Sequence, residues 1–396
     1  MPNAWLVKIT LLLASTLTVM SGATIAPSLP AMQDYFAEVS NADFWVKLVL
    51  TIPALFIVIG SPIAGQLVDV IGRKPLLIGS ALIYGFAGGS GYVLDSLFAI
   101  LGGRALLGLA VAGIMVSATT LIADYFSGDQ RANFMGLQAA FMGFGGVLFL
   151  SVGGFIADLN WRLPFLIYLF AWLLLPLMVR VLYEPERIPA ASDQGGQANV
   201  SSLPVRLLVL IYASALLMQV VFYLIPTQLP FYLKQIAGAD AARSGLAIAL
   251  STLFSAIASL NYGKIKQRFS FITILALAFS LMGLGYIGIG LVGTYGSVLL
   301  VLVPAGLGLG LLMPNLNVWT SKEAPDHLRG RALGGLTTFF FLGQFLSPIV
   351  SQPVSQSMGL TKTYGLSGLL LVVTGAVLWI SKKQICRFVA SAAGQS

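Results

Sequence analysis

Long stretches without a charged residue divide this chain, and most of them are about as long as a lipid bilayer is thick. Each helical residue rises ~1.5 Å, so a helix needs about 20 apolar residues to cross the hydrocarbon core. The stretches are Ile9–Gln33, Leu48–Val68, Pro75–Leu94, Leu97–Ala123 (interrupted by Arg104), Ala132–Ala157, Leu163–Val179, Leu207–Leu233, Ser244–Gly263, Phe269–Ser321, Ala332–Thr361 and Thr363–Ser381. Phe269–Ser321 is twice too long for one span and breaks naturally at Gly293–Ser297, so we predict about twelve helices.

These spans predict an all-α integral membrane protein. Only helices and closed barrels satisfy every backbone group in lipid, and runs this uniformly apolar lack the alternation of barrel strands. Hydrophobic residues make up 57% of the chain and charged residues 9%, with a mean hydropathy of +0.90, which leaves too few charges for a soluble domain of this size. The first apolar segment is too long for a signal-peptide core, so we expect it to be the first membrane helix.

The basic residues are scattered singly between the spans, which indicates membrane topology and argues against a nucleic-acid partner. Of the 22 Lys and Arg residues, Arg104 lies within a span, and five lie at the expected outer ends and loops: Lys47, Arg162, Lys234, Arg243 and Lys362. The others lie at the end that holds both termini. By the positive-inside rule, both termini face the cytoplasm, and we expect the chain in the plasma (inner) membrane.

The two halves of the chain repeat each other. A shift of 198 residues, half of the 396 in the chain, pairs Gly65 with Gly263, Gly108 with Gly306, Met115 with Met313, Arg131 with Arg329, Gly136 with Gly334 and Gly145 with Gly343. We therefore predict two pseudo-symmetric six-helix halves, residues 1–183 and 205–381, and a cytoplasmic tail, 382–396. Residues 184–204 are rich in Pro, Gly, Ser and Gln, which favours a flexible cytoplasmic linker over a regulatory binding segment.

A short charged turn joins the second and third spans. Its pattern, Gly65-x-x-x-Asp69-x-x-Gly72-Arg73-Lys74, resembles the loop between helices 2 and 3 of the major facilitator superfamily of transporters. Val70 stands where that family usually has a basic residue. Substrate in such transporters lies between two six-helix halves.

Asp69 ends a helix beside the expected start of another helix near Ala332, where unpaired N–H groups carry partial positive charge. Asp69 docked there, with Arg73 and Lys74 on nearby acids, would latch the halves together on the cytoplasmic side. The alternative is a solvated turn that only supplies inside-positive charge.

Further motifs resemble the drug and metabolite efflux branch of the same family. Gly103-Arg104 followed by Gly108 is similar to its Arg-x-x-x-Gly motif, with Leu107 in place of a common glutamine. The other matching segments are Ala123-Asp124 followed by Arg131, and Gly153-Gly154 followed by Asn160-Trp161-Arg162, although Phe149-Leu150 replace a frequent Gly-Pro. The resemblance implies a secondary active transporter that exports small amphipathic molecules, such as drugs or siderophores, by proton antiport.

Arg104 is the only charge well inside a span, where an unpaired charge costs at least ~2.5 kcal/mol. We expect it to serve substrate binding or coupling. The alternative is a structural role, in which the side chain snorkels to the outer interface or bonds carbonyls of the first helix. No Asp or Glu falls in the middle of a span. The candidate proton-binding acid is therefore Asp34, at the outer end of the first helix, linked electrostatically to Arg104.

Polar and aromatic residues inside the spans are candidates for a cavity lining, with helix–helix hydrogen bonds or lipid contact as the alternative for each. They are Gln138, Gln219, Tyr223, Asn315, Asn317, Phe340 and Gln344.

Other functional classes fit the sequence less well. An uncoupled or uptake carrier of a neutral or anionic metabolite remains open on the same fold. A channel would carry a repeated filter or a charged ring, and an enzyme would carry a catalytic cluster, HExxH or a nucleophile elbow, none of which the sequence contains. We expect no metal and no cofactor, and we expect a monomer whose partners are a small-molecule substrate, lipid and protons. Cys386 is the only cysteine, so the chain forms no internal disulfide.

Overall fold

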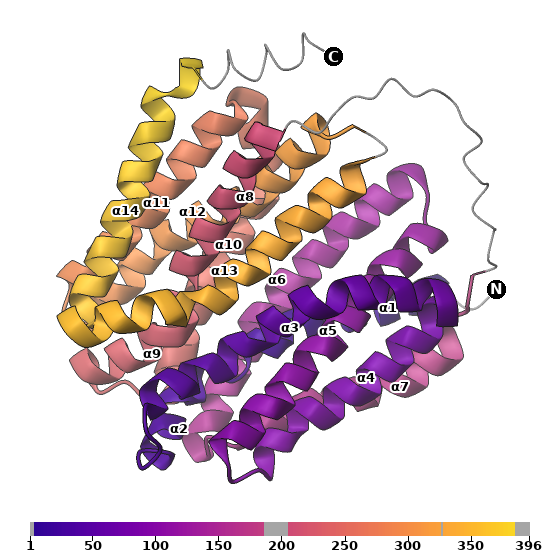
Figure 1. Ribbon diagram of the computed structural model, residues 1–396, viewed down its shortest axis with the longest axis horizontal. Coiled ribbons are helices and arrows are strands. Elements are labelled where there is room, and N and C mark those ends of the chain that lie inside the picture. The colour runs from indigo at the N-terminus through magenta and orange to yellow at the C-terminus, as the bar shows by residue number, and fades with distance from the viewer. Residues whose placement is uncertain (1–3, 186–204, 326–327, 385–396) are drawn as a thin grey trace.

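The computed structural model describes residues 4–185, 205–325 and 328–384, and its described elements are all helical (Figure 1). The first half contains α1 (Ala4–Ala23), η1 (Ala26–Ser28), α2 (Leu29–Tyr35), α3 (Ala42–Ile71), α4 (Arg73–Gly89), η2 (Ser90–Tyr92), α5 (Leu97–Tyr125), α6 (Gly128–Leu159), η3 (Leu163–Leu169) and α7 (Phe170–Val181). The second half contains α8 (Val205–Phe222), α9 (Leu224–Ala237), α10 (Ala241–Arg268), α11 (Phe271–Leu291), α12 (Tyr295–Glu323), α13 (Arg329–Met358) and α14 (Leu360–Ile380).

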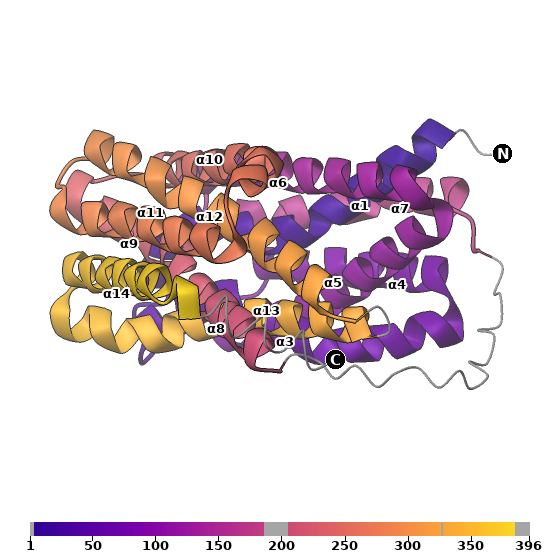
Figure 2. The same cartoon turned by 90° about the horizontal axis from the view of Figure 1, so that it is seen from above.

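Eleven helical stretches within these ranges are long and apolar enough to cross a bilayer. The twelfth span is α4, whose 17 residues continue into the 3-10 turn η2. The predicted all-α membrane fold is thus confirmed. Figure 1 and Figure 2 show the two halves as adjacent bundles, in which α6 and α10 lie side by side and α3 lies against α13. Most of the predicted linker and tail lies outside the described residues.

The packing repeats between the halves as the sequence does. Where α3 crosses α5, a Cβ atom on Gly108 would lie 2.4 Å from the carbonyl oxygen of Pro53. Where α10 crosses α12, a Cβ atom on Gly306 would lie 2.4 Å from the carbonyl oxygen of Ser251. Both residues of the second pair follow those of the first by 198 positions. Glycine lets membrane helices approach this closely, so the repeat in sequence is also a repeat in helix packing.

The first span of each half is broken, where the sequence predicts one continuous helix. α1 ends at Ala23 and the chain continues through η1 into α2, whereas α8 ends at Phe222 and continues into α9. Pro27 and Pro226 lie just beyond these breaks and have no N–H to donate to the preceding turn. Each break leaves the last carbonyls of α1 and α8 without partners inside their own helix, so side chains can bond them.

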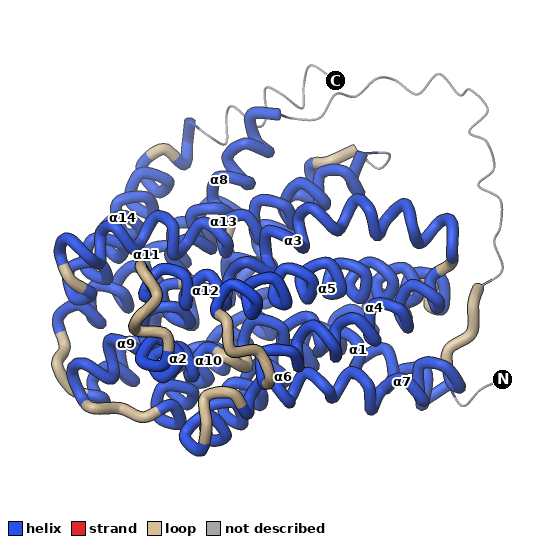
Figure 3. Tube along the Cα trace, turned by 60° about the horizontal axis from the view of Figure 1, so that its bottom comes forward, coloured by secondary structure: helices blue, strands red, loops and turns tan. Residues whose placement is uncertain are grey.

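Most connections between helices are short, as Figure 3 shows in tan. The break predicted between residues 293 and 297 is confirmed, since α12 begins after Thr294 and the side chains of Thr294 and Ser297 each accept the other's backbone N–H at 3.3 Å. α13 ends earlier than predicted, because Gly359 adopts a φ of +82° that suits glycine, and α14 begins at the next residue.

Candidate functional site

The two halves enclose a cavity, which we call the central cavity, of about 430 Å³. The residues that line it come from both halves and are Thr18, Val19, Ser21, Gly22, Ile57, Met115, Met142, Gly146, Leu150, Gln219, Phe222, Tyr223, Pro226, Ile248, Thr252, Met313, Asn317, Leu336, Thr337, Phe340, Phe341 and Gln344. Every one of these residues is uncharged, and most are apolar, aromatic or methionine. Such a lining suits an amphipathic molecule of small size.

A second cavity of about 510 Å³ adjoins the first and shares Thr18, Met115, Met142 and Asn317 with it. Its remaining lining residues include Ser15 of α1, Gln138 of α6 and Ser321 of α12. These residues lie toward the end of the bundle that holds the start of α1 and the end of α14, which we call the terminal end. We call the opposite end, at Asn41 and Thr294, the loop end. The two cavities together lead from the middle of the molecule toward the terminal end.

A salt bridge and several hydrogen bonds join the two halves at the loop end. The carboxylate of Asp34 lies 2.6 Å from Nζ of Lys234, and Asp158 accepts hydrogen bonds from the N–H groups of Ala241 at 2.7 Å and Ala242 at 3.1 Å. The role of Asp158 could not be predicted from the sequence, because its contact to α10 exists only when the halves are packed.

A further cluster joins α3 to α13 at the loop end. Lys47 is buried, donates a hydrogen bond to Oε1 of Gln352 and lies 5.1 Å from the ring of Phe231. Asp43 accepts hydrogen bonds from Gln352 and, at 2.8 Å, from Gln356. Sequence reasoning placed Lys47 at an outer end but did not identify this cluster, which depends on the amide groups of α13.

Arg104 is 1% exposed and lies behind the wall of the central cavity. Its Nε donates to the carbonyl oxygen of Val49 at 2.9 Å, and its Nη2 donates to that of Ser21, one of the last carbonyls of α1. Tyr168 donates to the same Ser21 oxygen at 3.0 Å, and its ring lies 5.2 Å from the guanidinium. Arg104 therefore braces the broken first span, and its charge lies one layer behind the cavity surface.

Asp34 and Arg104 are not brought together. Asp34 pairs instead with Lys234 at the exposed surface of the loop end.

The charged turn after α3 is held within its own half. Arg73 contacts Asp124 at 3.1 Å through Nε, and the backbone N–H groups of Arg73 and Lys74 donate to Glu184 at 2.8 and 2.7 Å. Gly72, at a φ of +100°, makes this turn possible, because a Cβ there would lie 2.6 Å from the Glu184 carboxylate. Asp69 is exposed and has no hydrogen bond or ion pair among the described residues, so it does not contact the start of α13 here. Gly65 has open space around it.

Of the residues predicted to line a cavity, five line the central cavity: Gln219, Tyr223, Asn317, Phe340 and Gln344. Gln138 lies on the adjoining cavity and donates to the hydroxyl of Ser15 at 2.8 Å. Asn315 lies elsewhere, since its amide donates to the carbonyl oxygen of Phe271 at 3.0 Å and it accepts from Tyr262 at 3.2 Å. Across the described ranges, no cluster of three or more His, Cys, Asp or Glu side chains could hold a metal ion.

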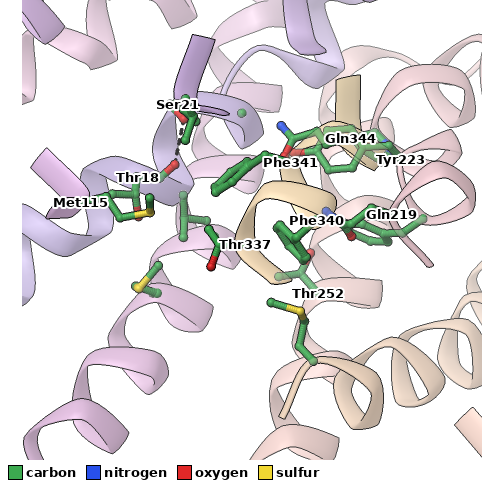
Figure 4. Close-up of a pocket in the computed structure, with 18 of the residues that line it drawn as sticks. Thr18, Ser21, Met115, Gln219, Tyr223, Thr252, Thr337, Phe340, Phe341 and Gln344 are labelled. Carbon is green, nitrogen blue, oxygen red and sulfur yellow. Dashed lines mark hydrogen bonds between the residues drawn. The ribbon is translucent and has the colours of Figure 1, made fainter. Parts of the chain in front are cut away.

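The polar side chains of the central cavity fall into two groups. Five of them donate to a carbonyl oxygen of their own helix: Thr18, Ser21, Thr252, Asn317 and Thr337. The other three, Gln219, Tyr223 and Gln344, make no side-chain hydrogen bond to any described residue. All three belong to the second half, and Figure 4 shows them on the side of the cavity opposite Thr18 and Met115.

Residues 11–348 match the family model of the Major Facilitator Superfamily. Among similar proteins, Multidrug resistance protein 1 of Bacillus subtilis (strain 168) is 29% identical over 73% of this chain and 75% of its own length. The Bacillibactin exporter of the same organism is 27% identical over 84% of this chain and 85% of its own. Multidrug resistance protein MdtG of Klebsiella pneumoniae (strain 342) is 26% identical over 91% of this chain and 89% of its own.

Solved structures show the same fold at lower identity. A D-xylose-proton symporter aligns with a TM-score of 0.80 and 16% identity, over 95% of this chain and 97% of that one. A bacterial homolog of the human lysosomal transporter Spinster, in an inward-facing and occupied conformation, aligns with a TM-score of 0.78 and 17% identity, over 97% of each chain.

Proposed function

The chain belongs to the major facilitator superfamily, and we propose that this transporter exports small amphipathic molecules from the cytoplasm. It is a membrane transporter and not an enzyme. One observation carries the export proposal: an uncharged cavity, rich in aromatic and methionine side chains, lies between the two halves. Relatives named for multidrug resistance and for bacillibactin export support the same direction of transport.

The distribution of basic residues supports an orientation with both termini in the cytoplasm, in the inner membrane. In that orientation the central cavity opens toward the cytoplasm through the adjoining cavity, and the loop end is closed. This is the state in which an exporter would collect its substrate. We propose a monomer as the working unit, since both halves that form the cavity come from one chain.

Exchange with protons is the proposed driving force, with an uncoupled carrier as the second candidate. The second candidate is favoured by one specific observation: among the residues that the structure describes, no acidic side chain lines either cavity. The acids that join the halves, Asp34, Asp43 and Asp158, lie at the loop end instead, where they would meet protons from outside.

The test has two stages. Cells that lack this protein and cells that express it are compared for accumulation of a panel of dyes, antibiotics and secreted chelators, and we expect lower accumulation of some of them on expression. Proteoliposomes then receive a pH gradient, and we expect uphill movement of the substrate found in the first stage. Equal accumulation across the panel would reject export, whereas downhill flux that ignores the gradient would replace the antiporter with an uncoupled carrier.

A further inference from the structure

We infer that Gln219, Tyr223 and Gln344 form the polar recognition point of the central cavity, and that the substrate is an uncharged aromatic molecule bearing a group that both donates and accepts hydrogen bonds, as a carboxamide does. This inference deepens the proposed function and rests on it.

Gln219 is the strongest indication. It is 1% exposed, it lines the cavity, and neither its Oε1 nor its Nε2 has a hydrogen-bond partner in the described part of the chain. A buried amide without partners costs free energy, so a helix in an apolar span gains nothing from keeping a glutamine there for packing alone. Such a group is expected where a ligand supplies the missing partners.

Helix packing places the other two groups beside it. α13 crosses α8 so closely at Gly343 that a Cβ there would lie 2.8 Å from the Cβ of Gln219, which brings the next residue, Gln344, to the same wall. Tyr223 lies at the break between α8 and α9. A Cβ on Gly22 of α1 would lie 3.2 Å from the hydroxyl of Tyr223 and 3.8 Å from Nε2 of Gln344. These two groups therefore converge on one point of the cavity.

The chemistry of the three groups defines the complementary ligand. Each glutamine offers an acceptor oxygen and a donor nitrogen, and the tyrosine hydroxyl offers both from one atom. A ligand group that only accepts, or only donates, would leave buried partners unpaired, and such mismatches are strongly rejected. An amide-like group satisfies both. The adjacent rings of Phe340 and Phe341, 5.4 Å apart and at right angles, provide faces and edges for an aromatic body.

The charge around the cavity argues against a preference for cations. None of the described acidic residues lines the wall, and the guanidinium of Arg104 lies behind Ser21, the residue next to Gly22. The position that corresponds to Arg104 in the second half is Leu302, so this positive charge has no counterpart there. A nearby positive charge repels a cationic ligand.

The experiment measures binding to the purified full chain in detergent by calorimetric titration. The probes are chloramphenicol, an uncharged aromatic amide, and tetraphenylphosphonium, an aromatic cation without hydrogen-bond donors. We expect the wild-type protein to bind chloramphenicol at least tenfold more tightly. Gln219→Leu should weaken chloramphenicol binding about tenfold or more and leave tetraphenylphosphonium unchanged, because it removes hydrogen bonds that only the amide can use. Gln267→Leu, an exposed glutamine at the terminal end of α10, is the matched control and should change neither.

Two further measurements separate recognition from a structural role. Gln219→Leu should keep or raise the melting temperature, because it removes a buried unpaired amide. Gln219→Glu should reverse the preference in favour of the cation. A lower melting temperature for Gln219→Leu, unchanged chloramphenicol affinity, or a wild-type preference for the cation would each overturn the inference. Export in vesicles is read separately: binding without export rejects the proposed function alone, and export that Gln219→Leu leaves intact rejects the recognition point alone.

Discussion

Asp158, at the end of α6, caps the first turn of α10 across the boundary between the halves, with one carboxylate oxygen 2.7 Å from the N–H of Ala241 and the other 3.1 Å from that of Ala242. These N–H groups have no partner within α10, and the positive end of a helix dipole favours a carboxylate there. The contact therefore joins the two halves at the loop end, and we expect it to help keep that end closed.

The same kind of contact was predicted at the opposite end, between Asp69 and the start of α13. In this structure Asp69 is exposed, while Asp158 occupies a helix terminus. If the halves rock about the central cavity, the terminal end closes as the loop end opens, and the reverse. The docking of Asp69 stays a prediction for the state in which the terminal end is closed.

The first prediction concerns Asp158→Asn. The charge–dipole contact is worth about 0.3–1 kcal/mol, and up to ~2 when partly buried, so its loss should open the loop end about 2- to 30-fold more often. We would measure the rate at which a maleimide labels Ser244→Cys, which is buried beside this contact, after Cys386→Ser. Asp95→Asn, an acid at the loop end paired within its own half to Arg162, is the control. Unchanged labelling would show that Asp158 does not hold this end closed.

The second prediction concerns glycine at the same boundary. A Cβ on Gly154 would lie 2.7 Å from the carbonyl oxygen of Ala241, so Gly154→Leu should prevent α6 and α10 from closing. We expect fast labelling of Ser244→Cys and loss of transport. Gly136→Leu, on the same helix but with open space around the glycine in the described structure, should leave both unchanged. Equal behaviour of the two variants would contradict the prediction.

Much of this fold follows from the sequence because a chain in lipid must satisfy all its backbone hydrogen bonds internally. Charge-free runs of bilayer length must be helices, and a pair such as Thr294 and Ser297 marks where one ends and the next begins. The faces of the helices are harder to predict. Asn315 and Asn317 are two residues apart, which turns them about 200° around the helix, so only Asn317 faces the cavity.

Contacts between the halves were beyond prediction for a different reason. They join residues far apart in the sequence, 83 positions for Asp158 and Ala241 and 200 for Asp34 and Lys234, and they exist only in one arrangement of the halves. A single span gives no indication of its partner, and a transporter has more than one arrangement.

The third prediction concerns Arg104. Arg104→Ala should abolish transport and lower stability by about 2–4 kcal/mol, because the carbonyl oxygens of Ser21 and Val49 lose charge-assisted hydrogen bonds. Arg104→Lys should retain part of the transport and part of the stability, since lysine keeps the charge but lacks the planar guanidinium group. Melting in detergent and vesicle transport are measured together. If Arg104→Ala has normal stability but no transport, Arg104 takes a direct part in coupling. If the variant transports normally, the hydrogen bonds of Arg104 are not needed for transport.

The fourth prediction concerns orientation. Single cysteines at Asn41, at the loop end, and Gln267, at the terminal end, should react with an impermeant maleimide from opposite sides of the membrane. We expect Asn41→Cys to react in intact cells and Gln267→Cys only after the cells are opened, because the basic residues favour the inside for the terminal end. Reaction of both from one side would contradict the span count, and the reverse pattern would turn the cavity toward the outside.

The last prediction concerns Asp69→Asn. In the state described here, Asp69 makes no hydrogen bond or ion pair with any described residue. The substitution should therefore weaken only the opposite state, in which Asp69 would dock at α13. The population should therefore shift several-fold toward the state with an open terminal end. In the Asp69→Asn background, Ala139→Cys, exposed on the adjoining cavity, should label faster, while transport falls and the melting temperature stays constant.

Gln66→Leu, on the same exposed turn of α3 as Asp69, is the control for a change of surface polarity. Slower labelling of Ala139→Cys would mean that Asp69 stabilises the open state, and wild-type transport would leave the turn only its topological role.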